Sequence, residues 1–265
     1  MNTIKLSYKY DDEHQDTAEV WIDGIVDGTP QRFILDTGCA TTCLFYNDFS
    51  AKYTSFGAKQ YSSAFGSATS ESIKVAQIGS GPIQRKDILI ARTEKGGNDK
   101  NLIGMDLLKD SILHLMPSQQ KVEILTSSSM NTQVQDLFLD SGSIPFIELD
   151  FGEQKAVAVW DTGASITIVD LNFFKQYREL FHSGGKTTGT DSAGHTFETE
   201  IYMMKPIKIG EHLFPTHRVV PLDLNHLGPK TGRGMDFILG YSTIRYANWL
   251  MDFPGRKWFI AKTLF

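Results

Sequence analysis

The sequence predicts a mainly β protein with few short helices, built from two similar halves. Two observations lead to this prediction. Short runs rich in β-branched and aromatic residues alternate with glycine-containing turns along most of the chain, whereas helical periodicity is sparse. In addition, one strand–turn–strand unit occurs twice, and each copy ends in Asp-Thr-Gly.

The repeated unit surrounds Asp36 and Asp161. The first copy reads VWIDGIVDGTPQRFILDTGCATTCLF, and the second reads FIELDFGEQKAVAVWDTGASITIV. Each contains a strand-like run, a turn with glycine, a second strand-like run, Asp-Thr-Gly and a β-branched stretch. Later in each half, two apolar residues are followed by a glycine, and the half ends in an apolar run. In the first half these are Leu102-Ile103-Gly104 and 121–125; in the second they are Ile238-Leu239-Gly240 and 257–261.

The segment between the two copies, TSSSMNTQVQ, is small and polar enough to be a linker. We therefore predict an N-terminal lobe at residues 1–125, a linker at 126–135 and a C-terminal lobe at 136–265. The spacing of apolar residues favours one helix over 170–181 and a short one over 104–109.

The composition is that of a globular protein: 265 residues, 41% hydrophobic and 22% charged. A formal net charge of -5 argues against nucleic acid as a partner, because binding to polyanions needs clustered Lys and Arg. No run approaches the roughly 18 apolar residues of a membrane span, and the N-terminus lacks an apolar signal-peptide core. These features predict a cytoplasmic protein, or a periplasmic or secreted one if a signal peptide has been removed.

Cysteine and histidine usage predicts neither a disulfide nor a metal site. Cys39 and Cys43 lie in a strand-like segment, which would separate their Cα atoms by roughly 13 Å, too far for a disulfide. We expect both to be buried thiols. The chain has no Cys-x-x-Cys or His-Glu-x-x-His pattern, and its histidines, including His212 and His217, form no ligand cluster, so no metal and no cofactor are predicted.

The two Asp-Thr-Gly loops carry the predicted chemistry. If Asp36 and Asp161 come within hydrogen-bonding distance, they cannot both ionise cheaply and will share a proton. One carboxyl group can then accept a proton from water while the other donates to a carbonyl oxygen. A single Asp-Thr-Gly tripeptide is weak evidence, since a strand followed by a turn also explains it. The second copy in the same context is what favours a catalytic pair.

The residues that follow each aspartate suit such a site. Gly38 and Gly163 allow a tight turn and close approach of substrate or water to the backbone. Thr37 and Thr162 carry short, stiff hydroxyl groups that can bond across a two-fold axis to the opposite loop.

The segments ILDTGCATT and VWDTGASIT, with their later LIG and ILG partners, resemble the aspartic proteases, the superfamily that includes pepsin and the retroviral proteases. The resemblance spans about residues 17–125 and 143–262, and the sequence around each motif is similar to the compact retropepsin-like proteases of bacteria. It implies a bilobal acid-protease fold of two pseudo-symmetric retropepsin-like β-barrel halves. It also implies a monomer, since one chain holds both halves.

The resemblance implies a role for each matching residue. Asp36 and Asp161 would form the catalytic dyad, and Gly104 and Gly240 would lie in apolar segments that cross beneath the two catalytic loops. The remaining loop residues would shape the dyad: Thr37, Gly38, Thr162 and Gly163.

Two features depart from the family pattern. The expected flaps, at 63–68 with Phe65 and Gly66 and at 190–195 with Gly194 and His195, lack the Tyr-Gly-x-Gly of pepsin. His195 would either lend a pH dependence or lie in an exposed turn. Cys39 stands where the family often has Ser or Ala; it is either a small buried hydrophobe or an exposed, redox-sensitive thiolate.

The predicted function is therefore aspartic endopeptidase activity on peptide or protein substrates. The alternative is a catalytically silent peptide-binding module of the same fold. Against it, binding alone gives no reason to place two carboxylates face to face. Glycoside hydrolysis by paired carboxylates is a third possibility, but it gives no reason for symmetric Thr-Gly loops.

Overall fold

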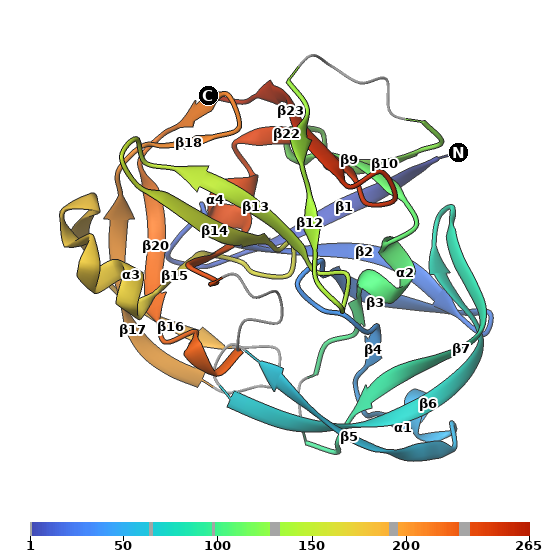
Figure 1. Ribbon diagram of the computed structural model, residues 1–265. Coiled ribbons are helices and arrows are strands. Elements are labelled where there is room, and N and C mark those ends of the chain that lie inside the picture. Colours follow the sequence, from blue (N-terminus) through green and yellow to red (C-terminus); the bar gives the residue numbers. More distant parts are fainter. Residues whose placement is uncertain (1, 64–65, 97–98, 128–132, 191–195, 228–233) are drawn as a thin grey trace.

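The computed structural model describes residues 2–63, 66–96, 99–127, 133–190, 196–227 and 234–265. Most of these residues lie in β-strands, as the alternating sequence pattern predicts (Figure 1). The α-helices among them are four to six residues long: α1 Asp48–Ala51, α2 Met105–Leu108, α3 Leu171–Gln176 and α4 Tyr241–Ile244. The short 3-10 helices are η1 Pro117–Gln119, η2 Arg178–Leu180 and η3 Asn225–Leu227. The prediction of a mainly β fold with few short helices is confirmed.

The strands form two sheets. The 13-stranded sheet has the order β11-β23-β22-β9-β10-β1-β2-β3-β8-β4-β7-β6-β5. Its strands are β1 Thr3–Tyr10, β2 Ala18–Val26, β3 Thr29–Leu35, β4 Cys43–Leu44, β5 Ser55–Ser63, β6 Gly66–Ser80, β7 Ile83–Thr93, β8 Leu102–Ile103, β9 Ile112–Met116, β10 Lys121–Leu125, β11 Gln135–Asp136, β22 Ala247–Asp252 and β23 Lys257–Thr263.

The 10-stranded sheet follows the order β16-β17-β20-β15-β21-β14-β13-β18-β19, and β12 pairs with β13 at its side. Its strands are β12 Phe138–Leu139, β13 Pro145–Asp150, β14 Lys155–Trp160, β15 Thr167–Asp170, β16 Phe181–Thr190, β17 Thr196–Met204, β18 Ile207–Ile209, β19 His212–Phe214, β20 His217–Leu222 and β21 Phe237–Leu239. The apolar residues of both sheets alternate inward along the strands and form the core.

The same pattern of strand pairing occurs around both Asp-Thr-Gly loops. In the first sheet, β3 runs parallel to β8, β4 runs parallel to β7, and β4 is antiparallel to β8. In the second sheet, β14 runs parallel to β21, β15 runs parallel to β20, and β15 is antiparallel to β21. Each loop therefore leaves a strand that is held by a parallel neighbour from later in the chain.

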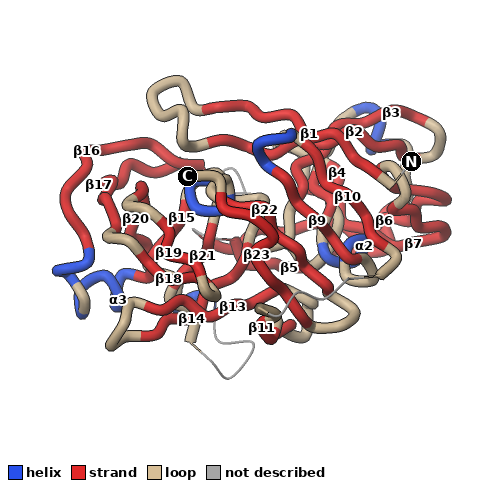
Figure 2. The backbone as a smooth tube through the Cα atoms, turned by 90° about the horizontal axis from the view of Figure 1, so that it is seen from above, coloured by secondary structure: helices blue, strands red, loops and turns tan. Residues whose placement is uncertain are grey.

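The last two strands of the chain complete the first sheet rather than the second. β22 pairs antiparallel with β9, so that Trp249 lies opposite Leu115 and Met251 opposite Leu113. The hairpins β9–β10 and β22–β23 are thus side by side, as Figure 2 shows. The predicted linker at 126–135 has its centre, 128–132, outside the described residues, and the lobe boundaries stay a prediction.

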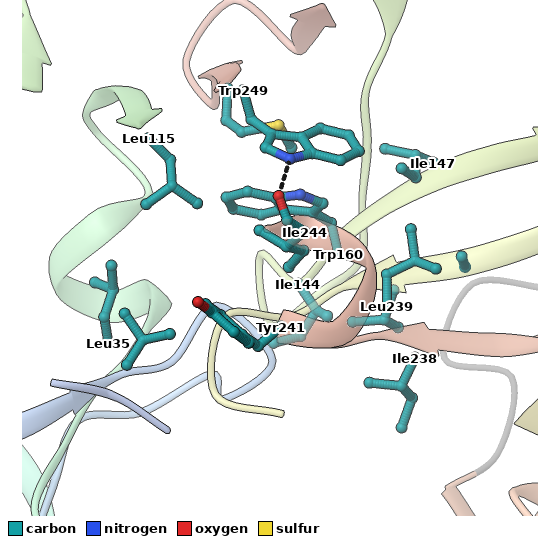
Figure 3. Close-up of a cluster of buried hydrophobic side chains, with 14 of the residues drawn as sticks. Leu35, Leu115, Ile144, Ile147, Trp160, Ile238, Leu239, Tyr241, Ile244 and Trp249 are labelled. Carbon is teal, nitrogen blue, oxygen red and sulfur yellow. Dashed lines mark hydrogen bonds between the residues drawn. The ribbon is translucent and has the colours of Figure 1, made fainter. Parts of the chain in front are cut away.

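A pair of buried tryptophans lies in the core (Figure 3). Trp160 and Trp249 are fully buried, with ring centroids 5.9 Å apart, and Trp249 Nε1 donates a hydrogen bond of 2.8 Å to the carbonyl of Ile244. Truncating a core aromatic of this size costs about 3–5 kcal/mol. Because Trp160 directly precedes Asp161, this packing fixes the base of the loop.

The predicted helix over 170–181 is shorter in the structure. It begins with Asp170, whose carboxylate accepts the N–H of Asn172 at 2.8 Å, but α3 ends at Gln176. Tyr177 leaves helical geometry, and Phe181 starts a strand in which its side chain is buried. Phe181 therefore lies in a strand that buries its side chain, although its spacing from the preceding apolar residues suits a helix. Of the described helices, none is long and apolar enough to span a membrane.

Candidate active site

The two aspartates leave the ends of equivalent strands. Asp36 follows β3, and its N–H donates to the carbonyl of Ile103 at 3.0 Å. Asp161 follows β14, and its N–H donates to the carbonyl of Leu239, also at 3.0 Å. Each aspartate is thus held by the last residue of the parallel neighbouring strand, β8 or β21.

The structure brings the two aspartates together through the glycines of the opposite loops. A Cβ atom at Gly38 would lie 2.4 Å from Cγ of Asp161, and a Cβ atom at Gly163 would lie 2.4 Å from Cγ of Asp36. The Gly38 N–H donates to Oδ1 of both carboxyl groups, at 3.0 Å to Asp36 and 3.1 Å to Asp161. Glycine is required at both positions because any side chain would occupy the place of the facing carboxyl group.

The two threonines link the loops reciprocally. The Thr37 N–H donates to Oγ1 of Thr162 at 3.2 Å, and the Thr162 N–H donates to Oγ1 of Thr37 at 3.0 Å. Each hydroxyl group then donates across to the other half: Thr37 to the carbonyl of Trp160 at 2.7 Å, and Thr162 to the carbonyl of Leu35 at 2.6 Å. Both side chains are buried, so the four bonds exclude water and hold the loops in one relative position.

The surroundings of the two carboxyl groups raise the pKa of both. Burial raises the pKa of Asp36 well above its ordinary value, and the charge of Asp161 and a hydrogen bond between the two carboxyl groups raise it further. Burial also raises the pKa of Asp161, but the N–H of Gly163 and the hydrogen bond from Asp36 favour its ionised form. These directions favour one proton on the pair, with Asp36 the carboxyl group whose protonated form the surroundings favour. The pair titrates as a unit.

Gly104 and Gly240 lie directly behind the loops. A Cβ atom at Gly104 would lie 2.7 Å from the carbonyl oxygen of Cys39, and one at Gly240 would lie 2.7 Å from that of Ala164. The residues that follow these glycines, Met105 and Tyr241, each donate a backbone N–H to the same carbonyl at 2.8 Å. The glycines therefore permit a close backbone contact that a larger residue would prevent.

A set of polar residues behind each loop was not predicted from the sequence. In the first half, the Thr42 hydroxyl donates to Asp106 at 2.6 Å and accepts the N–H of Gly104 at 3.0 Å. In the second half, Thr167 accepts the N–H of Gly240 at 3.1 Å. Thr42 and Thr167 occupy equivalent places in the two repeats, and that equivalence is the signal that would have identified them.

The described residues that flank the predicted flap segments belong to two pairs of antiparallel strands (Figure 1). Strands β5 and β6 pair up to Ser63 and Gly66, and β16 and β17 pair up to Thr190 and Thr196. Gly66 is thus the first residue of β6, whereas three predicted flap residues lie outside the described residues: Phe65, Gly194 and His195. The strand β5 also lies against η3, so this hairpin extends from the first sheet to the C-terminal half.

The cysteines are unpaired thiols, as predicted. Cys43 is buried, but Cys39 is partly exposed, so the expectation that both are buried holds only for Cys43. The Cys39 thiol donates to the carbonyl of Thr41 at 3.2 Å. Desolvation by the surrounding protein, and then the charge of the nearby Asp36, raise the pKa of the Cys39 thiol well above its ordinary value. The thiol therefore stays protonated, which argues against a reactive thiolate.

Within the ranges that the structure describes, no three His, Cys, Asp or Glu side chains are grouped to hold a metal ion. The groups that the described site itself offers for chemistry are the two carboxyl groups of Asp36 and Asp161. Both accept hydrogen bonds from backbone N–H groups, and their raised pKa values favour one shared proton.

One family model matches part of the chain. Residues 22–110 match the family model described as gag-polyprotein putative aspartyl protease. The matched region covers about a third of the chain and includes Asp36 and Gly104, whereas Asp161 lies outside it. No curated protein matches the chain. The match supports a protease-like function and supports placing the chain, through residues 22–110, in the aspartic protease superfamily.

Proposed function

We propose that the protein is an aspartic endopeptidase in which Asp36 and Asp161 activate a water molecule against a peptide bond. The observation that carries this proposal is the juxtaposition of the two carboxyl groups, each seated against the glycine of the opposite loop. Their raised pKa values and the hydrogen bond between them support a state with one shared proton. Such a pair contains both the base and the acid that hydrolysis of an amide needs.

The steps follow from the position of the proton. Asp161 accepts a proton from water as the water oxygen attacks the carbonyl carbon of the substrate. Asp36 donates its proton to the carbonyl oxygen, which gives a neutral tetrahedral intermediate. When the carbon–nitrogen bond breaks, the proton on Asp161 passes to the leaving amine, and a hydroxyl proton of the intermediate returns to Asp36. The pair ends in its starting state.

The two hairpins favour an extended peptide as the substrate. The strand pairs β5–β6 and β16–β17 come from different sheets. The contact of β5 with η3 joins the first sheet to the C-terminal half. Paired hairpins of this kind can add backbone hydrogen bonds to an extended chain. We further propose that the protein acts as a monomer with two lobes, because one chain supplies both carboxyl groups.

The test is digestion of a peptide library by the wild type, Asp36→Asn and Asp161→Asn, with and without pepstatin. We expect cleavage by the wild type only, with an acidic optimum. The exposed Asp12→Asn is the matched control and should cleave like the wild type. Cleavage that survives in either dyad variant would contradict the assignment. A wild type that binds peptides but cleaves none at any pH would favour the silent binding module.

A further inference from the structure

We propose that His217 is a positioning residue for the Asp161 loop: in its neutral form, with the proton on Nδ1, it orients a chain of hydroxyl groups that ends behind that loop. This inference rests on the proposed function for its catalytic consequence. The geometry on which it stands is independent of that function.

The protonation state of His217 follows from its partners. The ring is 1% exposed at the start of β20, and Nδ1 lies 2.8 Å from the carbonyl oxygen of Pro215. Because a carbonyl oxygen only accepts, Nδ1 carries the hydrogen. Nε2 of the neutral ring is then an acceptor, and the Thr243 hydroxyl, 2.7 Å away, donates to it.

The tautomer of His217 determines the direction of each hydrogen bond that follows in the chain. Thr243 Oγ1 lies 2.6 Å from Thr167 Oγ1, and since the hydrogen of Thr243 is directed at His217, Thr167 must be the donor. Thr167 Oγ1 in turn accepts the N–H of Gly240 at 3.1 Å. The lone pair on His217 therefore sets the orientation of both threonine hydroxyl groups.

The chain ends at the backing of the Asp161 loop. Gly240 packs against the loop so closely that a Cβ atom there would lie 2.4 Å from the carbonyl oxygen of Ile166 and 2.7 Å from that of Ala164. The next residue, Tyr241, donates its N–H to Ala164 at 2.8 Å. Ala164 follows the dyad loop directly, so a shift of Thr167 or Gly240 is transmitted to Asp161 through packed backbone.

The other half of the molecule shows what His217 replaces. There, Asp106 alone accepts both the hydroxyl and the N–H of Thr42. At the equivalent place the second half has Ser242, which accepts only the N–H of Thr167, at 2.9 Å, and donates its own hydrogen to a backbone carbonyl. The Thr167 hydroxyl therefore needs another acceptor. Thr243 and His217 supply it.

The groups around His217 keep it neutral over most of the pH range. Burial lowers its pKa to about 4, the nearby Arg245 lowers it as well, and the Pro215 carbonyl and Asp16 act in the opposite direction. Asp16 is itself paired with Arg218, and the Tyr246 ring lies 5.9 Å from the imidazole. Protonation would place an N–H against the Thr243 hydroxyl, and one of the two threonine hydroxyl hydrogens, of Thr243 or of Thr167, would then have no acceptor within the chain.

The test combines kinetics with NMR. We expect Thr243→Val to lower kcat by about tenfold to a hundredfold with little change in KM, because misplacement of a reacting group costs up to about that much. Thr243→Ser, which keeps the hydroxyl group, should restore kcat. His217→Gln, whose amide oxygen can accept from Thr243, should keep most of the activity at the optimum and extend it to lower pH. His212→Gln, in the edge strand β19, is the matched control and should match the wild type.

The NMR measurement separates this inference from the proposed function. The nitrogen shifts of His217 at neutral pH should show the proton on Nδ1. Besides any step caused by the two aspartates, which both proteins share, the amide signals of residues 161–164 should show a step near pH 4 that follows the His217 ring in the wild type and is absent in His217→Gln. A proton on Nε2, or loop signals that do not follow His217, would overturn the positioning role even if no substrate is ever cleaved. Wild-type kcat in folded Thr243→Val would overturn it as well.

Discussion

The Thr162 hydroxyl offers the sharpest test of how the two loops are held together. In Thr162→Val, two buried backbone groups lose their partners: the N–H of Thr37, now bonded at 3.2 Å, and the carbonyl of Leu35, now bonded at 2.6 Å. Each buried group left without a partner costs about 1–3 kcal/mol, and the added methyl returns about 0.8 kcal/mol. We therefore expect a net loss of about 3 kcal/mol in the free energy of unfolding.

A loss of this size is readily measured. For a chain of this length it corresponds to a fall in Tm of roughly 6–12 °C. Thr162→Ser keeps both bonds and loses one buried methyl group, so it should lose only about 1 kcal/mol. The exposed Thr54→Val is the surface control and should leave Tm unchanged. If the Val and Ser variants at position 162 melt at the same temperature, the hydroxyl bonds do not hold the loops.

Three further predictions concern the dyad and its surroundings. A carboxyl group whose pKa is raised by folding stabilises the protein fully at low pH and loses that contribution as pH rises. Asp36→Asn should therefore raise Tm at pH 7 but change Tm little at pH 3. An equal rise in Tm at both pH values would contradict the raised pKa of Asp36. Gly163→Ala places a methyl 2.4 Å from Cγ of Asp36 and should abolish cleavage, whereas Gly234→Ala, which meets no atom within 4 Å, should not; activity in Gly163→Ala would refute the close approach. Because the pKa of His217 is lowered from 6.5 to about 4, the free energy of unfolding should fall by up to about 3 kcal/mol as pH falls between those values. Denaturant titrations of the wild type and His217→Gln measure this. An equal fall in His217→Gln would contradict the lowered pKa of His217.

The parts of this molecule that the sequence predicts are those in which local pattern and local structure coincide. Asp36 and Asp161 are identifiable because a strand, a tight turn and a required glycine are all encoded within a few neighbouring residues. Gly104 and Gly240 are identifiable because the repeat places them at equivalent positions. The strand at 121–125 was also predicted with its observed bounds.

The parts that the sequence does not predict depend on partners far along the chain. His217 reads as an ordinary histidine because its role depends on Thr167 and Thr243, which come from other elements. The pairing of β22 with β9 joins segments more than a hundred residues apart, and no local pattern encodes such a register. The second half has Ser242 where the first half has Asp106, and the consequence of this difference for Thr167 is seen only when the hydrogen bonds of the two halves are compared.

The shared proton of Asp36 and Asp161 is tested most directly by measuring kcat/KM against pH on one cleaved peptide, for the wild type and for Asp36→Asn and Asp161→Asn. We expect a bell-shaped wild-type profile with an acidic maximum and a loss of at least about a hundredfold in each variant, because each removes either the acid or the base. A variant that keeps the wild-type kcat/KM at any pH would contradict a mechanism in which both carboxyl groups act on the same water and the same carbonyl.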